Sequence, residues 1–119
     1  MSRVGAVLER TFEADLLDRT LRVRGEVDDY GIIALRNLLA EHGTAPGSRL
    51  VVDLSGVDYL PSVAVGVLTR ALASADRTGA DLSLVAAQGS VAQRVLMVCA
   101  LPYRLGDRDD TPPDADVPA

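Results

Sequence analysis

The stretch Asp53–Leu68, which reads DLSGVDYLPSVAVGVL, decides the fold. It overlaps the apolar run Leu50–Leu54, passes through a glycine-containing segment and enters a helix that Ser62 opens. An uninterrupted apolar run of this kind predicts a central strand covered on both faces, here followed by a loop. The Ser62 hydroxyl is then expected at a helix N-terminus. There, free backbone N–H groups and the positive end of the helix dipole favour a phosphate.

The residues before this stretch predict a hairpin and a helix. The segment from about Val7 to Leu17 and the alternating segment Thr20–Arg24 predict a β-hairpin with one solvent-exposed face. Gly25 and the Asp28-Asp29 pair are expected to break the second strand. Either aspartate can cap a helix from about Tyr30 to His42, which presents one apolar side to a sheet.

The residues after Ser62 predict a helix, a strand, a second helix and a short last strand. The first helix runs from Ser62 to about Thr78, and a strand follows at Asp81–Ala86. Ser90 is expected to cap a helix that reaches about Cys99, and Tyr103–Leu105 adds the last strand. Because strands and helices alternate after the hairpin, crossover connections and a partly parallel sheet are required.

These elements together predict one α/β domain over residues 1–105. Its mixed sheet has four to five strands, and three to four helices pack on it. The chain of 119 residues is long enough to bury one core without disulfides or a metal. The tail 106–119 is acidic and proline-rich, has no apolar periodicity, and is expected to be disordered.

Composition excludes several classes of function. The net charge is −5, and the tail contributes most of it through five aspartates and one arginine, so the body is close to neutral. A near-neutral body with three Tyr, one Phe and no Trp suits neither a DNA-binding face nor base stacking, so we expect no direct nucleic-acid partner. Lysine is absent, which excludes Schiff-base and Walker-type chemistry.

The single cysteine and the single histidine give no catalytic or metal site. Cys99 cannot form an internal disulfide and is expected to be a buried, inert thiol. His42 lies at a helix end without a Gly-x-Ser-x-Gly elbow, and the Cys/His clusters of metal sites are missing. We therefore expect a protein that is not an enzyme and carries no cofactor.

The sequence also indicates the cellular compartment. No signal peptide precedes the first apolar segment, and no apolar run approaches the roughly 20 residues that span a bilayer, so a cytoplasmic protein without membrane insertion is expected.

Asp53 ends an apolar strand as the phospho-acceptor of a receiver domain does, but a receiver also needs a lysine. Asp53 is expected instead to accept hydrogen bonds from loop amides.

Three segments in this order resemble the STAS domain of bacterial anti-sigma-factor antagonists over about residues 8 to 105. They are RGEVD at Arg24–Asp28, the DLSG and PSVAVG pair that ends at Gly66, and VAQRVLMVCAL at Val91–Leu101. In that family a motif Asp-Ser-Ser/Thr-Gly-Leu-Gly carries the serine that a partner kinase phosphorylates, and Ser62 stands at its position.

This chain departs from the family motif around that serine. Pro61 stands where Asp is usual, Val63 replaces the second hydroxyl residue, and Ala64 replaces glycine. Whatever hydrogen bonds or kinase recognition the Asp provides are therefore missing. The departures leave open a constitutive binding variant that is not phosphorylated, with Ser62 only a helix cap worth about 1 kcal/mol.

The resemblance implies an antagonist that docks on an anti-sigma factor and frees a sigma factor. The implied partner is a serine-protein kinase with a histidine-kinase-like ATPase fold, which phosphorylates Ser62 and supplies the ATP and Mg²⁺ itself. A second implied role is that of a STAS accessory subunit of an ABC-type lipid transport complex, in which phosphorylation is not needed. The pattern leaves the oligomeric state open.

The start of the helix at Ser62 is the expected contact surface. At about 100° per residue, Val63 and Gly66 project on the polar side with Arg70, and Val67 lies at its border. Exposed valines beside the serine form an apolar patch that a partner would bury, unless the preceding loop folds over them. The predicted partner-binding residues are Asp28, Pro61, Ser62, Val63, Gly66, Val67 and Arg70.

Overall fold

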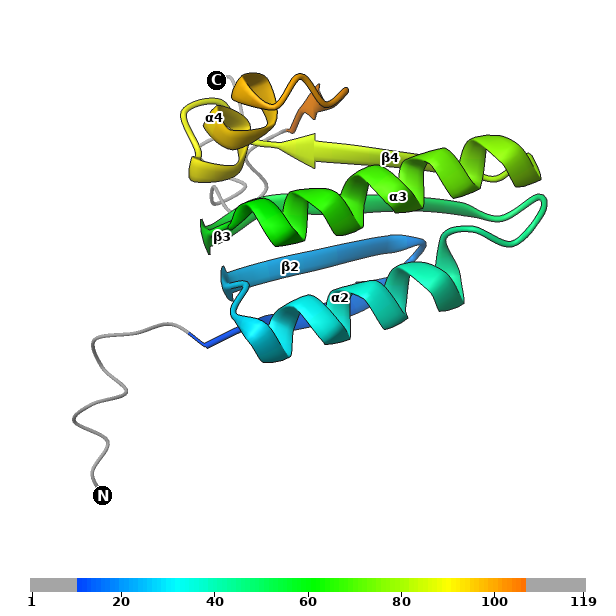
Figure 1. Ribbon diagram of the computed structural model, residues 1–119, viewed down its shortest axis with the longest axis horizontal. Helices are drawn as coiled ribbons and strands as arrows, with labels where there is room; N and C mark the ends of the chain where they lie inside the picture. The colour runs from blue at the N-terminus through cyan, green and yellow to red at the C-terminus, as the bar shows by residue number, and fades with distance from the viewer. Residues whose placement is uncertain (1–10, 107–119) are drawn as a thin grey trace, which may run out of the picture.

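The computed structural model describes residues 11–106, which form a five-stranded sheet with helices packed on it (Figure 1). The strands are β1 (Glu13–Leu17), β2 (Thr20–Glu26), β3 (Arg49–Tyr59), β4 (Asp81–Ala86) and β5 (Arg104–Leu105), and the helices are α2 (Asp29–His42), α3 (Ser62–Thr78) and α4 (Val91–Val98). The predicted α/β fold is confirmed. The tail predicted to be disordered lies, beyond Gly106, outside the described residues.

The sheet is mixed, with strand order β1-β2-β3-β4-β5. β1 pairs antiparallel with β2, whereas the pairings of β2 with β3, β3 with β4 and β4 with β5 are all parallel. Each parallel pair is joined by a helical crossover, as the alternation of elements predicts. Consequently β2, β3 and β4 end at one edge of the sheet, and α2, α3 and α4 begin there (Figure 1).

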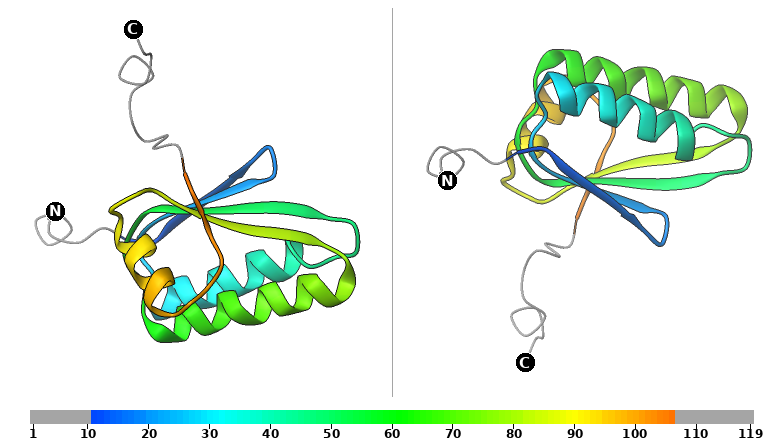
Figure 2. Two further views of the ribbon diagram at one scale, coloured as in Figure 1. Left: turned by 90° about the horizontal axis from the view of Figure 1, so that it is seen from above. Right: turned by 90° about the horizontal axis from the view of Figure 1, so that it is seen from below.

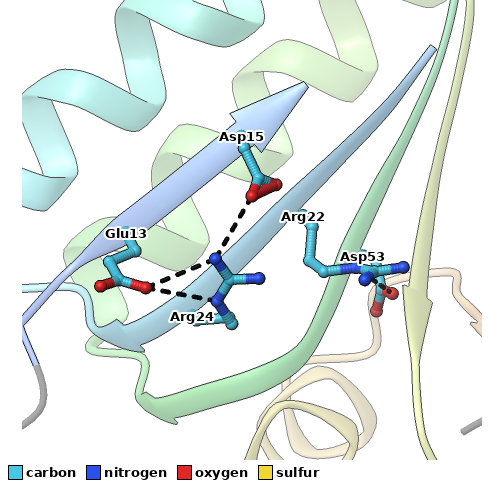
Figure 3. Close-up of polar contacts among 5 residues, drawn as sticks. All are labelled: Glu13, Asp15, Arg22, Arg24 and Asp53. Atoms are coloured by element: carbon cyan, nitrogen blue, oxygen red, sulfur yellow. Dashed lines mark hydrogen bonds and ion pairs between the residues drawn. The ribbon is translucent and has the colours of Figure 1, made fainter. Parts of the chain in front are cut away.

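The predicted hairpin is confirmed from Glu13 onward, and the part of its first segment before residue 11 lies outside the described residues. Its two-residue turn places Asp18 and Arg19 at φ values of 54° and 65°, the left-handed conformation that a type I′ turn requires at both central positions. Its exposed face carries a charged cluster, since Arg24 donates to Glu13 at 3.4 Å and to Asp15 at 3.3 Å (Figure 3).

Gly25 does not break the second strand, so that prediction was wrong. β2 continues to Glu26, and its register against β3 shifts between Gly25 and Glu26. Gly25 has a φ of 84°, which glycine adopts without strain. The glycine therefore allows an irregularity within the strand instead of ending it.

One face of the sheet is covered by α2 and α3, which lie side by side (Figure 2). The core fills the space between them and contains the fully buried side chains of Val52, Leu54, Leu35, Leu39 and Leu68. The helices begin and end where the local signals indicate. Asp28 caps α2, and Gly79, at a φ of 82°, closes α3.

The other face of the sheet is not covered by any of the described helices, which corrects the expectation that β3 is covered on both faces (Figure 2). Val51 on that face is half-buried, and a trough of about 680 Å³ runs across it between the hairpin and β5. The run Leu50–Leu54 predicted two covered faces because it contains only one polar residue, Asp53. Asp53 lines the trough on the open face and is nevertheless only 5% exposed.

Asp53 lies within β3 and not at a strand end as predicted, because β3 continues for six residues to Tyr59. Its Oδ1 accepts a hydrogen bond from the backbone N–H of Ser55 at 3.0 Å, and its Oδ2 lies 3.7 Å from the Arg22 Nε (Figure 3). The carboxylate does satisfy a backbone amide, as expected, but in a strand. The predicted loop after Leu54 reduces to Leu60 and Pro61.

The two helical glycines that face different surroundings give a test of this packing. A Cβ on Gly31 of α2 would lie 2.7 Å from the Phe12 ring, whereas a Cβ on Gly66 of α3 would meet nothing within 4 Å. We expect Gly31→Ala to lower the free energy of unfolding by about 1–3 kcal/mol through overpacking. Gly66→Ala should raise it by about 0.5–1 kcal/mol through helix propensity.

Urea denaturation of the two variants beside the wild type measures both changes. Equal effects of the two substitutions would contradict the placement of Phe12 over the first turn of α2.

Candidate partner-binding surface

The parallel pairing of β2 and β3 brings two predicted site segments to the same edge of the sheet. The backbone N–H of Val27 donates to the carbonyl of Tyr59 at 3.0 Å, so the residues that follow these strands begin side by side. Asp28 follows directly and caps α2, and Leu60 and Pro61 lead into α3. The loop at Asp28 and the start of α3 at Ser62 are therefore neighbours, in the arrangement that the family resemblance implies.

Asp28 combines capping with exposure. Its Oδ1 accepts a hydrogen bond from the backbone N–H of Gly31 at 2.8 Å, which confirms it as the N-cap of α2. The residue is nevertheless exposed. A second carboxylate oxygen therefore remains for a partner while the first holds the helix.

Ser62 is not a cap, so that interpretation was wrong. The N-cap of α3 is Pro61, with φ −75° and ψ 165°, and no side chain makes a cap hydrogen bond there. Ser62 is the first helical residue and is exposed. Its hydroxyl has no structural partner among the described residues. The first turn of α3, which contains no acidic residue, leaves its backbone N–H groups to solvent or a ligand.

The residues that follow Ser62 divide between surface and interior. Val63 is 62% exposed, Arg70 is exposed and Gly66 is half-buried with open space above it. Because the connection before α3 is only two residues long, it does not fold over Val63, and the alternative in which a loop covers this valine is wrong. An exposed valine therefore lies directly beside the hydroxyl.

Val67 is buried, with 6% exposure, which contradicts its placement on the border of the contact surface. It lies with Leu39 and Ala71 between α3 and α2. The helical projection assumed that α3 buries one face, against the sheet. In the structure α2 packs along a second side of α3, so Val67 belongs to the interior.

Two exposed aromatic side chains at the same edge were not predicted. Tyr30 in the first turn of α2 is 71% exposed and meets the Phe12 ring edge-on at 6.2 Å, and Tyr59 at the end of β3 is 52% exposed. Ile33 in α2 and Val63 in the first turn of α3 are also exposed, and we refer to these four exposed residues together as the carboxyl-edge patch: Tyr30, Ile33, Tyr59 and Val63. The sequence pattern predicts a loop at Tyr59, whereas β3 continues to this residue.

Cys99 is exposed, so the expectation of a buried thiol was wrong. The helix α4 ends at Val98, and Cys99 is its C-cap. Only Ala92 and Leu96 of this helix are buried, because α4 packs against β3 along a narrow stripe. Its last turn therefore projects into solvent.

The described part of the chain holds no group of three His, Cys, Asp or Glu residues placed to bind a metal ion. A search of residues 11–106 for a helix both long and apolar enough to cross a bilayer finds none.

Comparisons with known proteins agree with this architecture. Residues 11–99 match the family model described as Mlab, STAS domain. An anti-sigma factor antagonist from Mycobacterium paratuberculosis is similar in structure, with a TM-score of 0.58 and 22% identity over 84% of this chain and 88% of that one. The anti-sigma factor antagonist SpoIIAA in its unphosphorylated form gives a TM-score of 0.61 at 15% identity, over 84% and 91% of the two chains.

Two serines at helix starts provide a test of the site geometry. The Ser90 hydroxyl accepts a hydrogen bond from the backbone N–H of Gln93 at 3.1 Å, whereas the Ser62 hydroxyl caps nothing. We expect Ser90→Ala to lower the free energy of unfolding by about 1 kcal/mol. Ser62→Ala should change it by less than about 0.5 kcal/mol. Urea denaturation measures both, and an equal loss in the two variants would give Ser62 a structural role after all.

Proposed function

Because the chain belongs to the STAS-domain family, we propose that it is an anti-sigma-factor antagonist: it binds an anti-sigma factor and thereby releases a sigma factor. One observation carries the proposal. Ser62 presents an exposed hydroxyl at the start of α3 that has no hydrogen-bond partner among residues 11–106, directly beside the exposed Val63. A free hydroxyl next to exposed apolar side chains fits a modifiable site inside a protein interface.

The proposed contact surface is the start of α3 with the neighbouring loop. It includes Ser62, Val63, Gly66 and Arg70 from α3, Pro61 before it and Asp28 beside it. The carboxyl-edge patch extends it, since Tyr30 and Tyr59 supply the aromatic area that is enriched in protein interfaces. Val67 contributes only as interior packing that holds α3 against α2.

Phosphorylation of Ser62 is the proposed switch. A phosphate adds roughly −1.5 to −2 charge. The first turn of α3 can accept this charge on its free N–H groups and its positive dipole end without any change of fold. A partner that covers the same surface must desolvate the dianion, which costs several kcal/mol by order of magnitude unless an arginine meets it. Phosphorylation would therefore abolish binding and leave the domain folded.

The proposed partner is an anti-sigma factor that is also the kinase, with a histidine-kinase-like ATPase fold. It holds the ATP and Mg²⁺, and this chain supplies only the accepting hydroxyl. The domain then acts as a binding module, without catalysis of its own. The exposed position of Ser62 at a helix start suits an acceptor, because a kinase must reach the hydroxyl from outside.

A second candidate is favoured by the residues around the serine. Pro61 supplies no carboxylate, and Val63 and Ala64 replace the hydroxyl residue and the glycine of the phosphorylated motif. These residues suit a STAS domain that binds its partner constitutively, such as an accessory subunit of an ABC-type lipid transport complex. In that role the same apolar surface would contact a transport ATPase.

Affinity capture separates these functions. We would capture partners from native lysate with the wild type, Ser62→Asp and the control Ala73→Asp. The control adds the same charge at an exposed site three turns along α3, and mass spectrometry identifies what each variant retains. We expect a kinase-like anti-sigma factor to be retained by the wild type and the control and lost by Ser62→Asp.

The other outcomes are also decisive. The same anti-sigma factor on all three proteins would mean a constitutive antagonist, and a transport ATPase would establish the second candidate. With the purified partner, Ser62→Asp should weaken binding at least tenfold, about 1.4 kcal/mol. An aspartate in the first helical turn is favourable for folding, so loss of binding would not reflect unfolding.

A further inference from the structure

A groove lies between α2 and α3 and has an apolar floor. Its floor is made by Leu39, Val67 and Ala71, which are at most 8% exposed, and its volume is about 170 Å³. Arg36 from α2 and Arg70 from α3 are both exposed and stand on the rim. We call this feature the arginine groove; its full lining is Arg36, Leu39, Ala40, Thr44, Val67, Arg70, Ala71 and Ser74.

The arginine groove carries positive charge on both of its sides. Its lining holds two guanidinium groups and no carboxylate. Two arginines of the sheet stand beside carboxylates: Arg24 beside Glu13 and Asp15, and Arg49 beside Asp81. Within residues 11–106, neither Arg36 nor Arg70 has a hydrogen bond or an ion pair. Two guanidinium groups without a partner in the described part of the chain therefore flank one apolar slot.

We propose that the arginine groove receives an acidic segment of the protein partner. One apolar side chain of that segment enters the groove, and carboxylates on either side of it pair with Arg36 and Arg70. The proposal rests on the proposed function and deepens it by stating the chemistry of the segment that binds. Guanidinium groups bind carboxylates through parallel hydrogen bonds, which gives direction as well as charge.

The size of the groove favours a protein side chain over a small ligand. Small-molecule sites usually measure about 300–1,000 Å³, well above the 170 Å³ found here. The lining contains no aromatic side chain, so it offers no stacking platform for a base. An apolar slot with a charged rim instead has the organisation of a small protein–protein interface.

Helical spacing places two residues of the carboxyl-edge patch along the same sides of α2 and α3 as the two groove arginines. On α2, Ile33 precedes Arg36 by one helical turn, and on α3, Val63 and Gly66 precede Arg70 at spacings of seven and four residues. These spacings place the residues along the same sides of the two helices. A partner segment that covers Val63 therefore extends along the helices onto the two arginines without leaving the surface.

Charge reversal tests the proposal. The probe is the purified partner identified by affinity capture, titrated with the full chain carrying Arg36→Glu, Arg70→Glu or the control Arg77→Glu. Arg77 is an exposed arginine in the last turn of α3, outside the groove. We expect each groove reversal to weaken binding about tenfold in 50 mM salt and the loss to shrink in 500 mM salt. The control should stay within twofold of the wild type.

Affinities of both groove variants within twofold of the control would overturn the proposal. Equal urea midpoints would show that the variants are folded, and Arg70→Gln replaces Arg70→Glu if that variant unfolds. The switch is measured separately by Ser62→Asp. If Ser62→Asp binds like the wild type while the groove variants bind weakly, the phosphorylation hypothesis is wrong and the proposed role of the arginine groove is supported. If Ser62→Asp binds weakly while the groove variants bind like the control, only the proposed role of the groove is wrong.

Photo-crosslinking identifies the partner segment that binds in the arginine groove and so shows directly whether it is acidic. A benzoylphenylalanine at Ala40, an exposed residue of the groove rim, would link to whatever covers it. We expect the linked peptide of the partner to carry an apolar residue with Asp or Glu within four residues on both sides. A linked peptide that is basic, or that carries no carboxylate, would contradict the proposal.

Discussion

The parallel pairing of β2 and β3 is the constraint on which the surface of this protein depends. The hydrogen bond from Val27 to Tyr59 fixes where both strands end. Since the crossover helices must start at that edge, α2 and α3 begin next to each other and run back over the same face of the sheet. A cap residue of one helix, the first turn of the other and two exposed tyrosines are thereby gathered from two segments of the chain that are distant in sequence.

The two faces of the sheet have different tasks. The helix-covered face holds the apolar core, and residues such as Val52, Leu54 and Leu68 are fully buried there. The open face is organised by charges, with Arg22 beside Asp53 and Arg24 between Glu13 and Asp15 (Figure 3). Because stability is concentrated in the apolar core, the outer sides of α2 and α3 can carry residues that contribute little to folding. That freedom is what a binding surface requires.

The start of α3 is an example of a surface segment that contributes little to folding, because it has no side-chain cap. α2 and α4 are each capped by a side chain, Asp28 and Ser90, whereas α3 begins at Pro61 without one. A missing cap forgoes about 1 kcal/mol of helix stability. In return, the first-turn N–H groups and the Ser62 hydroxyl stay accessible. The packing of α3 against both the sheet and α2 offsets this loss, since six residues of the helix are buried.

Local signals in the sequence determined most of the elements. The bounds of α3 and β4, the turn of the hairpin, and the caps Asp28 and Ser90 all follow from apolar periodicity, capping residues and glycine stops, which act within one or two turns of chain. The same periodicity placed Val63, Gly66 and Arg70 on the polar side of α3.

Only the tertiary structure decided which surfaces are covered. Val67 is buried because α2 lies along α3, Cys99 is exposed because α4 packs along a narrow stripe, and β3 continues to Tyr59 because β2 pairs with it beyond the bulge at Gly25. The open face of β3 and the arginine groove likewise depend on which neighbours are present. Burial and strand length are set by partners distant in the chain, and no periodicity within a single segment reports them.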